Sequence, residues 1–329
     1  MSRMLTYEQF VKTIDQLEEA QLLLAALELD IFTHIDGERL TAKQIAKKAK
    51  MDATAAEALL NCLVTLKALK LKEGRYANTQ EMRKHFCKTS PDYKKGTVML
   101  RQENYEEYGN LIRVIKKGRN FTGKHQPDNP KRRALFTHAM HERSLSRAGV
   151  VAEKVCRKPV GKLLDLGAGP GTYSACILKK DKEASAVLLD RASALKTARE
   201  IWGGKPVWKR IDTRPGDLFD TDFGTGFDTV LFSNILHIYN PAENLKLLRK
   251  MHRALNPGGR LVMLDYFLND DRTQPLQASM FSLTMLLFTE TGKTYTWKET
   301  EELLKKAGFS KPQRIPLPDD SGLLTGCKK

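Results

Sequence analysis

The sequence lacks the features of several classes of protein. Its five cysteines are odd in number and include no C-x-x-C pair, which argues against a disulfide scaffold and against a zinc site. The longest apolar run, near residues 22–27, is far shorter than the roughly 20 residues of a membrane-spanning helix. Residues 1–5 do not read as a signal peptide. We therefore expect a soluble, cytoplasmic protein without metal or membrane contacts.

The composition and the charge are those of a packed globular protein. The 329 residues are 41% hydrophobic and 8% aromatic, enough for two ordinary domains. A net charge of +16 suggests nucleic acid, but the excess is +9 over residues 1–150 and +7 over the remainder. A lysine excess spread over the whole chain is more typical of a solvated surface than of a dedicated binding stripe.

The first hundred residues have the outline of a winged helix. Apolar residues recur at spacings of three to five over residues 7–29, which predicts a core or interface helix. They are Phe10, Ile14, Leu17, Leu22, Ala25 and Leu29. Thr41 and Asp52 occupy N-cap positions before two shorter helical segments, over 42–50 and 53–66. Two extended segments around Glu73-Gly74 then predict a hairpin over 69–78.

The second short helix argues against DNA binding by this winged helix. In a helix-turn-helix reader that helix enters the major groove and needs donors for phosphates and bases. Residues 53–66 contain no Lys or Arg and one acidic residue, Glu57. We therefore favour a module that forms a homodimer and binds no nucleic acid. The basic segment Lys43–Lys50 supports the alternative, a DNA-binding regulator.

The remainder of the chain changes from helices to alternating strands and helices. Residues 92–158 are expected to be mostly helical, with Asp128 or Asn129 capping a helix from Pro130 through Val155. Strands are predicted at Lys162–Leu166, Ser185–Asp190, Val207–Ile211, Phe227–Ser233 and Arg260–Phe267. Helices separate them at Thr172–Lys180, Ala192–Ile201 and Ala242–Leu255. This alternation predicts an α/β fold with a parallel, doubly wound sheet. A helix over 296–307 and an antiparallel edge from 312–316 and 322–328 complete it.

A glycine-rich segment follows the first of these strands. Glycine lets the backbone approach a bound nucleotide and points helix N–H groups at it. The G-x-G-x-G spacing of Gly167, Gly169 and Gly171 differs from the dinucleotide fingerprint, which has its third glycine one place later. Asp165 lies on the strand, and Asp190 ends the next strand, where a carboxylate can accept from ribose hydroxyls. Together they predict a site for a nucleotide-like cofactor.

Three further segments complete a family pattern. They are Gly216-Asp217-Leu218-Phe219, Ser233-Asn-Ile-Leu-His237 and Asn256-Pro-Gly-Gly259. With them, the chain resembles S-adenosylmethionine-dependent class I methyltransferases, and more narrowly the caffeate/hydroxyindole O-methyltransferase family. The resemblance extends over the winged helix, the Phe136–Met140 segment and Ser282–Leu286 followed by Gly292.

The resemblance implies a Rossmann-like sheet, S-adenosylmethionine as cofactor and two domains. Residues 1–100 would form the dimerisation domain and residues 101–329 the methyltransferase domain, in which 101–158 is a helical connector that lines the acceptor pocket. Gly167 and its neighbours would contact the methionine part of the cofactor and Asp190 the ribose. Asp217, Leu218 and Phe219 would contact the adenine. Ser233 stands near the cofactor, where plant relatives have a lysine and animal relatives an arginine.

His237 matches the catalytic base of that family, and its chemistry agrees. It follows the fourth strand at the carboxyl end, where open α/β sheets bind ligands. A phenol with a pKa near 10 is a poor nucleophile at neutral pH unless it loses its proton, and a neutral imidazole can take that proton. Asp265, at the end of the fifth strand, corresponds to a glutamate that orients the base in plant members.

Two acidic positions of the family are changed in this chain. The acidic residue that commonly follows the histidine is Ile238 here, and a second glutamate of plant members falls at Thr294. Methionines and aromatics suit a planar apolar acceptor. The expected lining residues are Phe136, Met140, His141, Met280, Phe281 and Met285. No third ligand accompanies His138 and His141 at a spacing that would suggest a metal site.

We therefore predict an O-methyltransferase that acts on a hydroxyl of a small, aromatic metabolite. The alternatives within the family are carbon or nitrogen methylation, or cofactor binding without methyl transfer. The alternative of another class is a DNA-binding regulator that senses S-adenosylmethionine.

Overall fold

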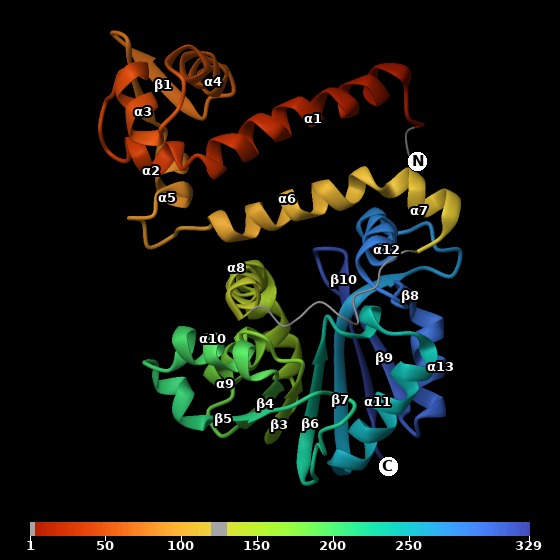
Figure 1. The fold of residues 1–329 in the computed structure, drawn as a ribbon. Coiled ribbons are helices and arrows are strands. Elements are labelled where there is room, and N and C mark those ends of the chain that lie inside the picture. Colours follow the sequence, from red (N-terminus) through yellow and green to blue (C-terminus); the bar gives the residue numbers. More distant parts are fainter. Residues whose placement is uncertain (1–3, 120–129) are drawn as a thin grey trace. The chain divides into compact units, whose positions relative to one another are not determined.

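The computed structural model of the chain describes residues 4–119 and 130–329 (Figure 1). Its backbone forms two compact units, Met1–Asn104 and Tyr105–Lys329. The predicted caps Asp128 and Asn129 lie outside the described residues. Within the described parts, no helix combines the length and the apolar character that a membrane crossing requires.

The first unit consists of short helices and a hairpin after one long helix. Its elements are α1 (Tyr7–Glu28), α2 (Ile31–Ile35), α3 (Ala42–Ala49), α4 (Ala53–Thr65), β1 (Leu69–Lys72), β2 (Arg75–Asn78), α5 (Gln80–Phe86) and the start of α6 (Lys95–Gly109). Thr41 caps α3 in a capping box with Gln44, and Asp52 accepts from the Ala55 N–H at the start of α4. The hairpin turns at Glu73 and Gly74, both at positive φ. The predicted caps and hairpin are therefore confirmed.

The apolar stripe of α1 lies mostly on the surface of the chain. Phe10, Ile14 and Leu17 are 54%, 57% and 47% exposed, while the core of this unit is formed by the end of α1 and by α2 to β2 with α5. The stripe is thus not a core face within the described chain. An exposed apolar stripe of this kind is typical of an interaction surface.

The second unit contains the predicted parallel sheet with an antiparallel edge. The strands are β3 (Lys162–Leu166), β4 (Ser185–Asp190), β5 (Ile211–Pro215), β6 (Phe227–Ser233), β7 (Leu255–Leu268), β8 (Tyr295–Thr296), β9 (Ser310–Pro316) and β10 (Ser321–Cys327). Their order is β5-β4-β3-β6-β7-β10-β9, with β8 beside β7. Neighbouring strands in the series β5-β4-β3-β6-β7 pair in parallel, and β10 pairs antiparallel with both β7 and β9.

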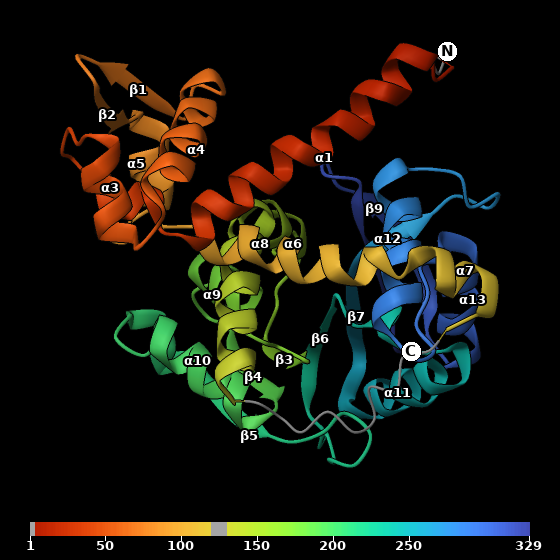
Figure 2. The same ribbon diagram turned by 45° about the horizontal axis from the view of Figure 1, so that its top comes forward.

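Helices cover both faces of this sheet (Figures 1 and 2). One core contains residues of α8 (Pro130–Val155), α9 (Thr172–Lys180) and α10 (Ala192–Trp202). The other contains residues of α11 (Pro241–Ala254) and α13 (Trp297–Lys306). Side chains alternate along each strand, so Leu163 belongs to the first core and Leu164 and Leu166 to the second. Two further helices, α7 (Leu111–Lys117) and α12 (Leu276–Phe288), complete the unit.

One predicted strand, Val207–Ile211, is wrong. The short 3-10 helix η2 (Pro206–Arg210) occupies this segment, and β5 begins only at Ile211. Proline favours the first turn of a helix because its φ is fixed and its missing N–H needs no partner. The Arg210 guanidinium also donates to four backbone carbonyls between residues 178 and 184. These contacts come from a distant segment, so the local apolar pattern could not reveal them.

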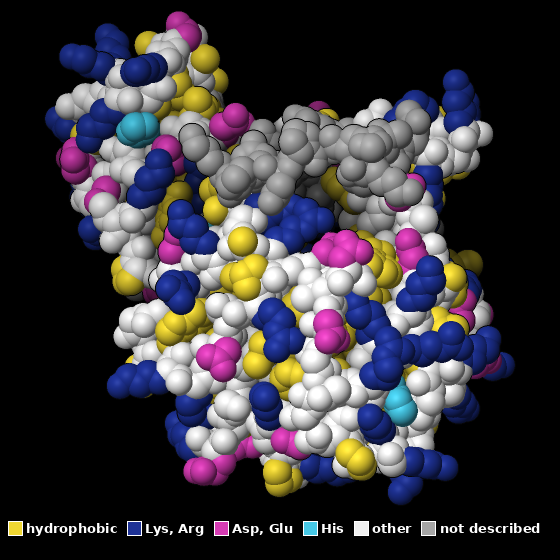
Figure 3. All heavy atoms as spheres, turned by 60° about the horizontal axis from the view of Figure 1, so that its bottom comes forward, with side chains coloured by type: hydrophobic (Ala, Val, Ile, Leu, Met, Phe, Trp, Pro, Cys, Tyr) yellow, Lys and Arg dark blue, Asp and Glu magenta, His cyan; other side chains and the backbone are white. Residues whose placement is uncertain are grey.

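One face of the molecule shows how the charged side chains are distributed there (Figure 3). On the face shown in Figure 3, Lys and Arg side chains are scattered and alternate with Asp and Glu. No single basic stripe dominates the part of that face which the structure describes. This distribution is that of a solvated surface.

Candidate active site

The predicted cofactor and base residues lie at the carboxyl ends of the parallel strands. Strand β3 has β4 on one side and β6 on the other, so the direction of winding reverses between β3 and β6. Loops that leave neighbouring strands in opposite directions open a crevice at such a switch point, and open α/β sheets bind their ligands there. The segments after β3, β4, β5 and β6 carry the predicted cofactor and base residues.

The glycine turn, residues 167–171, leads from β3 into α9. Gly167, Gly169 and Gly171 have φ values of +66°, +52° and +63°, a region that side-chain-bearing residues rarely adopt. An added Cβ at Gly167 would lie 2.6 Å from Ile235 Cδ1, and one at Gly171 would lie 2.7 Å from Leu188 Cδ1. At Gly169 it would meet no atom within 4 Å. The turn is therefore packed at its two ends and open in its middle.

A buried carboxyl group, Asp165, lies on β3 just before this turn. It is 1% exposed, and its Oδ2 accepts from the Ser174 hydroxyl at 2.6 Å. Its Oδ1 is buried and has no hydrogen-bond partner among the described residues. Burial raises the pKa of Asp165 to about 7, because an ionised carboxylate loses its hydration there. A buried oxygen without a hydrogen-bond partner is unusual, and it can accept a hydrogen bond from a donor that binds there.

Asp190 ties the end of β4 to the glycine turn. Its Oδ2 accepts from the Gly169 N–H at 2.7 Å, and its Oδ1 accepts from the Arg191 N–H at 2.6 Å. Burial raises the pKa of Asp190, although these hydrogen bonds oppose the shift. The carboxylate thus reaches the one glycine of the turn that faces open space.

The loop after β5 carries Asp217, Leu218 and Phe219. Asp217 Oδ1 accepts from the Phe219 N–H at 2.8 Å, and Leu218 is buried. The Lys250 ammonium of α11 donates to the carbonyl oxygens of Leu218, Phe219 and Thr221. The Phe219 ring meets the Tyr239 ring edge to face at 5.1 Å. This loop is therefore fixed by α11 and touches the segment that follows His237.

His237 and Asp265 form a buried pair. His237 Nδ1 lies 2.7 Å and 3.0 Å from the two carboxylate oxygens of Asp265, and the two side chains are only 10% and 1% exposed. When Nδ1 carries the proton, this N–H donates to the carboxylate, and Nε2 carries the lone pair of the ring. Within the described parts of the chain, Nε2 has no hydrogen-bond partner. The arrangement is that of an oriented base.

The predicted acceptor residues fall into two groups. On α12, the Phe281 ring meets the His237 ring at 4.7 Å and the Tyr266 ring at 5.1 Å. Met280 is 45% exposed and Met285 is buried. Phe281 is thus the predicted lining residue that the structure places in contact with the base.

The α8 residues are placed differently from one another. Phe136 is 49% exposed and Met140 is half-buried. His141 Nδ1 lies 2.7 Å from the Thr172 hydroxyl at the start of α9, and its ring meets Trp202 edge to face. Burial, with nearby Lys205 and Lys179, lowers the pKa of His141 to about 4. His141 therefore lies against the helix that follows the glycine turn.

Of the positions that depart from the family pattern, Ser233 and Thr294 are buried and Ile238 is half-buried. Ser233, the last residue of β6, is 8% exposed. Thr294 is 1% exposed, and its hydroxyl has no hydrogen-bond partner among the described residues. Neither brings a charge to the site. Across the residues that the structure describes, no group of three His, Cys, Asp or Glu is placed to hold a metal ion.

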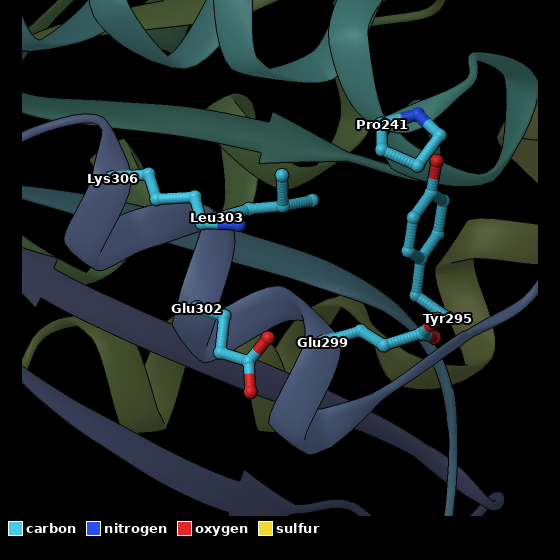
Figure 4. A pocket seen from close by; sticks show the side chains of 6 residues that line it. All are labelled: Pro241, Tyr295, Glu299, Glu302, Leu303 and Lys306. Atoms are coloured by element: carbon cyan, nitrogen blue, oxygen red, sulfur yellow. The ribbon is translucent and has the colours of Figure 1, made fainter.

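A small pocket of about 160 Å³ lies outside this site, between α13 and the start of α11. It is lined by Pro241, Tyr295, Glu299, Glu302, Leu303 and Lys306. Figure 4 shows the Tyr295 side chain extending toward Pro241. His237 and Asp265 do not line it. No residue of the glycine turn lines it either, so the pocket is separate from the predicted cofactor and base residues.

Several residues around the site were not predicted from the sequence. Asn244 and Tyr295 contact the segment around His237, and Tyr266 receives hydrogen bonds from Arg143 and Arg147. The only sequence signal near Asn244 is the capping box of Asn240 and Glu243, which marks the start of α11. Such signals identify a helix but not the contacts of its buried face.

Family models and known proteins match most of this chain. A model of the O-methyltransferase domain matches residues 115–310, and a model of the O-methyltransferase dimerisation domain matches residues 11–83. The 3-hydroxy-5-methyl-1-naphthoate 3-O-methyltransferase of Streptomyces sahachiroi is 27% identical over 94% of this chain and 92% of its own. The L-tyrosine C(3)-methyltransferase of Streptomyces lavendulae is 29% identical over 91% of this chain and 86% of its own.

Solved structures share the fold. Human N-acetylserotonin methyltransferase, in complex with SAM, superimposes with a TM-score of 0.86 at 22% identity, over 99% of both chains. The matches confirm the family and the fold class that the sequence predicts. Because the domain model covers more than half of the chain and the dimerisation model precedes it, this protein belongs to the O-methyltransferase family.

Proposed function

We propose that the protein transfers a methyl group from S-adenosylmethionine to a hydroxyl of a small aromatic metabolite, with His237 as general base. The observation that carries this proposal is the buried His237–Asp265 pair, whose Nε2 remains available at the carboxyl end of β6. A buried ionisable pair is costly unless it is well hydrogen-bonded, and Asp265 accepts from both His237 and the Tyr266 N–H. The pair follows β6, the neighbour of the strand that leads into the glycine turn, which supports a role at that site.

The residues around the glycine turn fit the proposed cofactor. The turn is open at Gly169, where a Cβ would meet nothing within 4 Å, and Asp190 lies against the same residue. The unpartnered Oδ1 of Asp165 offers a further acceptor. We assign Asp165, Gly167, Gly169, Gly171 and Asp190 to the cofactor. Asp217, Leu218, Phe219 and Ser233 complete this group.

The chain's own residues would then move one proton. Bound S-adenosylmethionine supplies an electrophilic methyl group on a sulfonium. His237 Nε2 takes the proton of the acceptor hydroxyl, so that the oxygen lone pair becomes available for attack. Asp265, bonded to Nδ1, stabilises the imidazolium that forms. Phe281 provides an apolar wall beside the base and, with Phe136, Met140, His141, Met280 and Met285, forms the proposed acceptor pocket.

Carbon methylation is the second candidate, because one relative is named a C(3)-methyltransferase of L-tyrosine. A phenolate delivers charge to its oxygen and to the adjacent ring carbons, so the same base can serve both outcomes. The base pair by itself therefore supports methyl transfer to a phenol-like acceptor. The atom that receives the methyl group is decided by how the acceptor lies in the pocket.

The first experiment identifies the product. The protein is incubated with S-adenosylmethionine carrying a ¹³C-labelled methyl group and a small-molecule extract of the source cells, and labelled products are separated by mass and examined by NMR. We expect a labelled methyl on an oxygen of an aromatic compound. A methyl on a ring carbon would establish the second candidate. Absence of any labelled product, while S-adenosylhomocysteine binds, would contradict methyl transfer.

We further propose that residues 1–100 form a homodimer. The exposed apolar stripe of α1 and the match to a dimerisation domain over residues 11–83 support this. The variant Ile14→Asp/Leu17→Asp should be monomeric by light scattering at concentrations where the wild type is a dimer. A monomeric wild type would refute the proposal, and specific binding of DNA by the wild type would favour the regulator instead.

A further inference from the structure

The turn that carries His237 has little internal support. It consists of the 3-10 helix η3 (Leu236–Ile238). The Ile238 N–H donates to the carbonyl oxygen of Ile235 at 2.9 Å, whereas the Tyr239 N–H lies 3.5 Å from the carbonyl oxygen of Leu236. A 3-10 turn of three residues has poor hydrogen-bond geometry. Its position must therefore be fixed by contacts from outside the turn.

Asn244 supplies such a contact from α11. It is fully buried, and its Nδ2 donates to the carbonyl oxygen of Leu236 at 2.8 Å and to that of Tyr239 at 3.0 Å. These two carbonyls lie before and after His237 in the chain. One amide group thus holds both sides of the base turn, residues 236–239.

Tyr295 adds a second support from β8. Its hydroxyl donates to the Tyr239 carbonyl at 2.6 Å and lies 3.1 Å from Asn244 Nδ2. Burial raises the pKa of Tyr295, so the hydroxyl keeps its proton and remains a donor. Asn244 and Tyr295 together are called the clasp below.

The residue Gly292 also packs against the base turn. An added Cβ at Gly292 would overlap the carbonyl oxygen of His237, and the Gly292 carbonyl accepts from the Arg119 guanidinium at 2.6 Å. The turn therefore contacts both the clasp and Gly292. The clasp supplies its side-chain hydrogen bonds to the carbonyl oxygens of Leu236 and Tyr239.

Asp265 fixes the imidazole at one point only, its Nδ1. The other point that determines where Nε2 lies is the backbone of His237. A general base works only within hydrogen-bond reach of the proton that it takes, and small displacements cost much of the rate. A base held at both points keeps a single tautomer and a single ring orientation.

We propose that Asn244, assisted by Tyr295, is a positioning residue that holds His237 in the single Nδ1-protonated tautomer facing Asp265. The inference rests on the proposed role of His237. It adds that the base depends on an amide seven residues further along the chain, on a different element, which is not among the proposed cofactor or acceptor residues. Without the clasp, the two carbonyls lose their donor and the turn relaxes.

The test reads the tautomer directly by NMR. Each variant is prepared with ¹⁵N-labelled histidine and saturated with S-adenosylhomocysteine, and the chain's seven histidines are resolved, with His237→Gln identifying the signal of His237. In the wild type we expect ring nitrogen shifts of one tautomer, with the proton on Nδ1. In Asn244→Ala they should move toward the average of two tautomers, and in Tyr295→Phe they should move less in the same direction.

Asn78 provides a matched control. In the first unit, its Nδ2 donates to the carbonyls of Phe32 at 2.8 Å and Asp36 at 2.9 Å, so Asn78→Ala removes a comparable pair of hydrogen bonds far from His237 in the sequence. We expect the His237 signal to be unchanged in this variant. An unchanged His237 signal in folded Asn244→Ala, or an equal shift in Asn78→Ala, would overturn the proposal. If Asn244→Ala does not fold, a His237 signal in Tyr295→Phe that equals the wild-type signal would be enough to overturn the proposal.

This measurement needs neither an acceptor nor turnover. A tautomer shift in Asn244→Ala without methyl transfer by the wild type would support the clasp and refute the proposed function. Methyl transfer by the wild type with no tautomer shift would do the reverse. The two failures are therefore distinguishable.

Discussion

The glycine turn, residues 167–171, and the base turn, residues 236–239, follow neighbouring strands of one sheet, β3 and β6, yet they are held in different ways. The glycine turn takes its conformation from three positive-φ glycines, and its outside support includes the Asp190 carboxylate of the neighbouring strand β4, which accepts from the Gly169 N–H. The base turn is held by side chains from β7, β8 and α11. The conformation of the proposed cofactor half of the site is thus encoded mainly by its own glycines, whereas the proposed base half depends on side chains far away in the sequence.

The contrast predicts that the two halves can be damaged separately, and the largest effect should come from the base itself. The variant His237→Gln removes the proton acceptor and leaves the glycine turn, residues 167–171, unchanged in sequence. We expect the rate of labelled-product formation to fall about 10²- to 10⁴-fold, the range for loss of a general base, with the affinity for S-adenosylhomocysteine unchanged by calorimetry.

His252 serves as the control for this variant. It is a histidine of α11 whose ring meets Phe309 at 5.1 Å, outside the proposed site, so His252→Gln should retain the wild-type rate. Turnover that survives in His237→Gln would refute the assignment of the base. A parallel loss of cofactor affinity would show that the two halves are not separable.

How much the sequence could predict follows the same division. The strand, turn and helix of residues 163–174 are contiguous, and the need for glycine at positive φ is readable from spacing alone. His237 and Asp265 are 28 residues apart, and only the resemblance to a family suggested their pairing. Asn244 and Tyr295 are 51 apart and belong to different elements, so no local pattern brings them together.

The wrongly predicted strand at Val207–Ile211 has a similar origin. The segment of Val207 has the apolar character of a strand, but Pro206 and the contacts of Arg210 make it a 3-10 helix. His141 was assigned to the acceptor pocket, which remains a prediction, while its hydrogen bond goes to Thr172 beside the glycine turn. Propensity and periodicity describe a segment, whereas these outcomes depend on what packs against it.

A smaller effect is expected at the open glycine, where the cofactor half can be tested alone. Gly169→Leu places a side chain in the space where the structure has no atom within 4 Å of a Cβ. We expect the affinity for S-adenosylhomocysteine to fall roughly 100-fold or more, since a side chain there excludes the ligand from the turn. The ¹⁵N shifts of His237 in the ligand-free protein should remain those of the ligand-free wild type.

Gly258→Leu controls for backbone strain. Gly258 also has a positive φ and open space around its Cβ, so both variants carry the left-handed penalty of about 1–2 kcal/mol. Only Gly169→Leu should lose cofactor affinity. If Gly258→Leu loses it equally, the effect is destabilisation, and the open middle of the turn has no special part in binding.

The smallest effect concerns the buried charge beneath the glycine turn. The folded protein raises the pKa of Asp165 to about 7 from an ordinary value of 3.8, so the folded state holds a proton that the unfolded state releases between these values. The contribution of Asp165 to stability is therefore complete below about pH 4 and is lost as the pH rises toward 7. Asp165→Asn does not titrate.

The free energy of unfolding of Asp165→Asn, relative to that of the wild type, should accordingly increase between pH 5 and pH 8, by an amount on the order of 2 kcal/mol. Both proteins are measured without ligand. Urea unfolding at these two pH values measures the difference, and Asp212→Asn, at an exposed residue of β5, controls for the loss of one negative charge. An equal response of both variants would mean that burial of Asp165 carries no cost. The expected result, in contrast, means that the buried Asp165 carboxylate carries an electrostatic cost next to the glycine turn. A hydrogen-bond donor or a cation that reaches its unpartnered Oδ1 would relieve this cost.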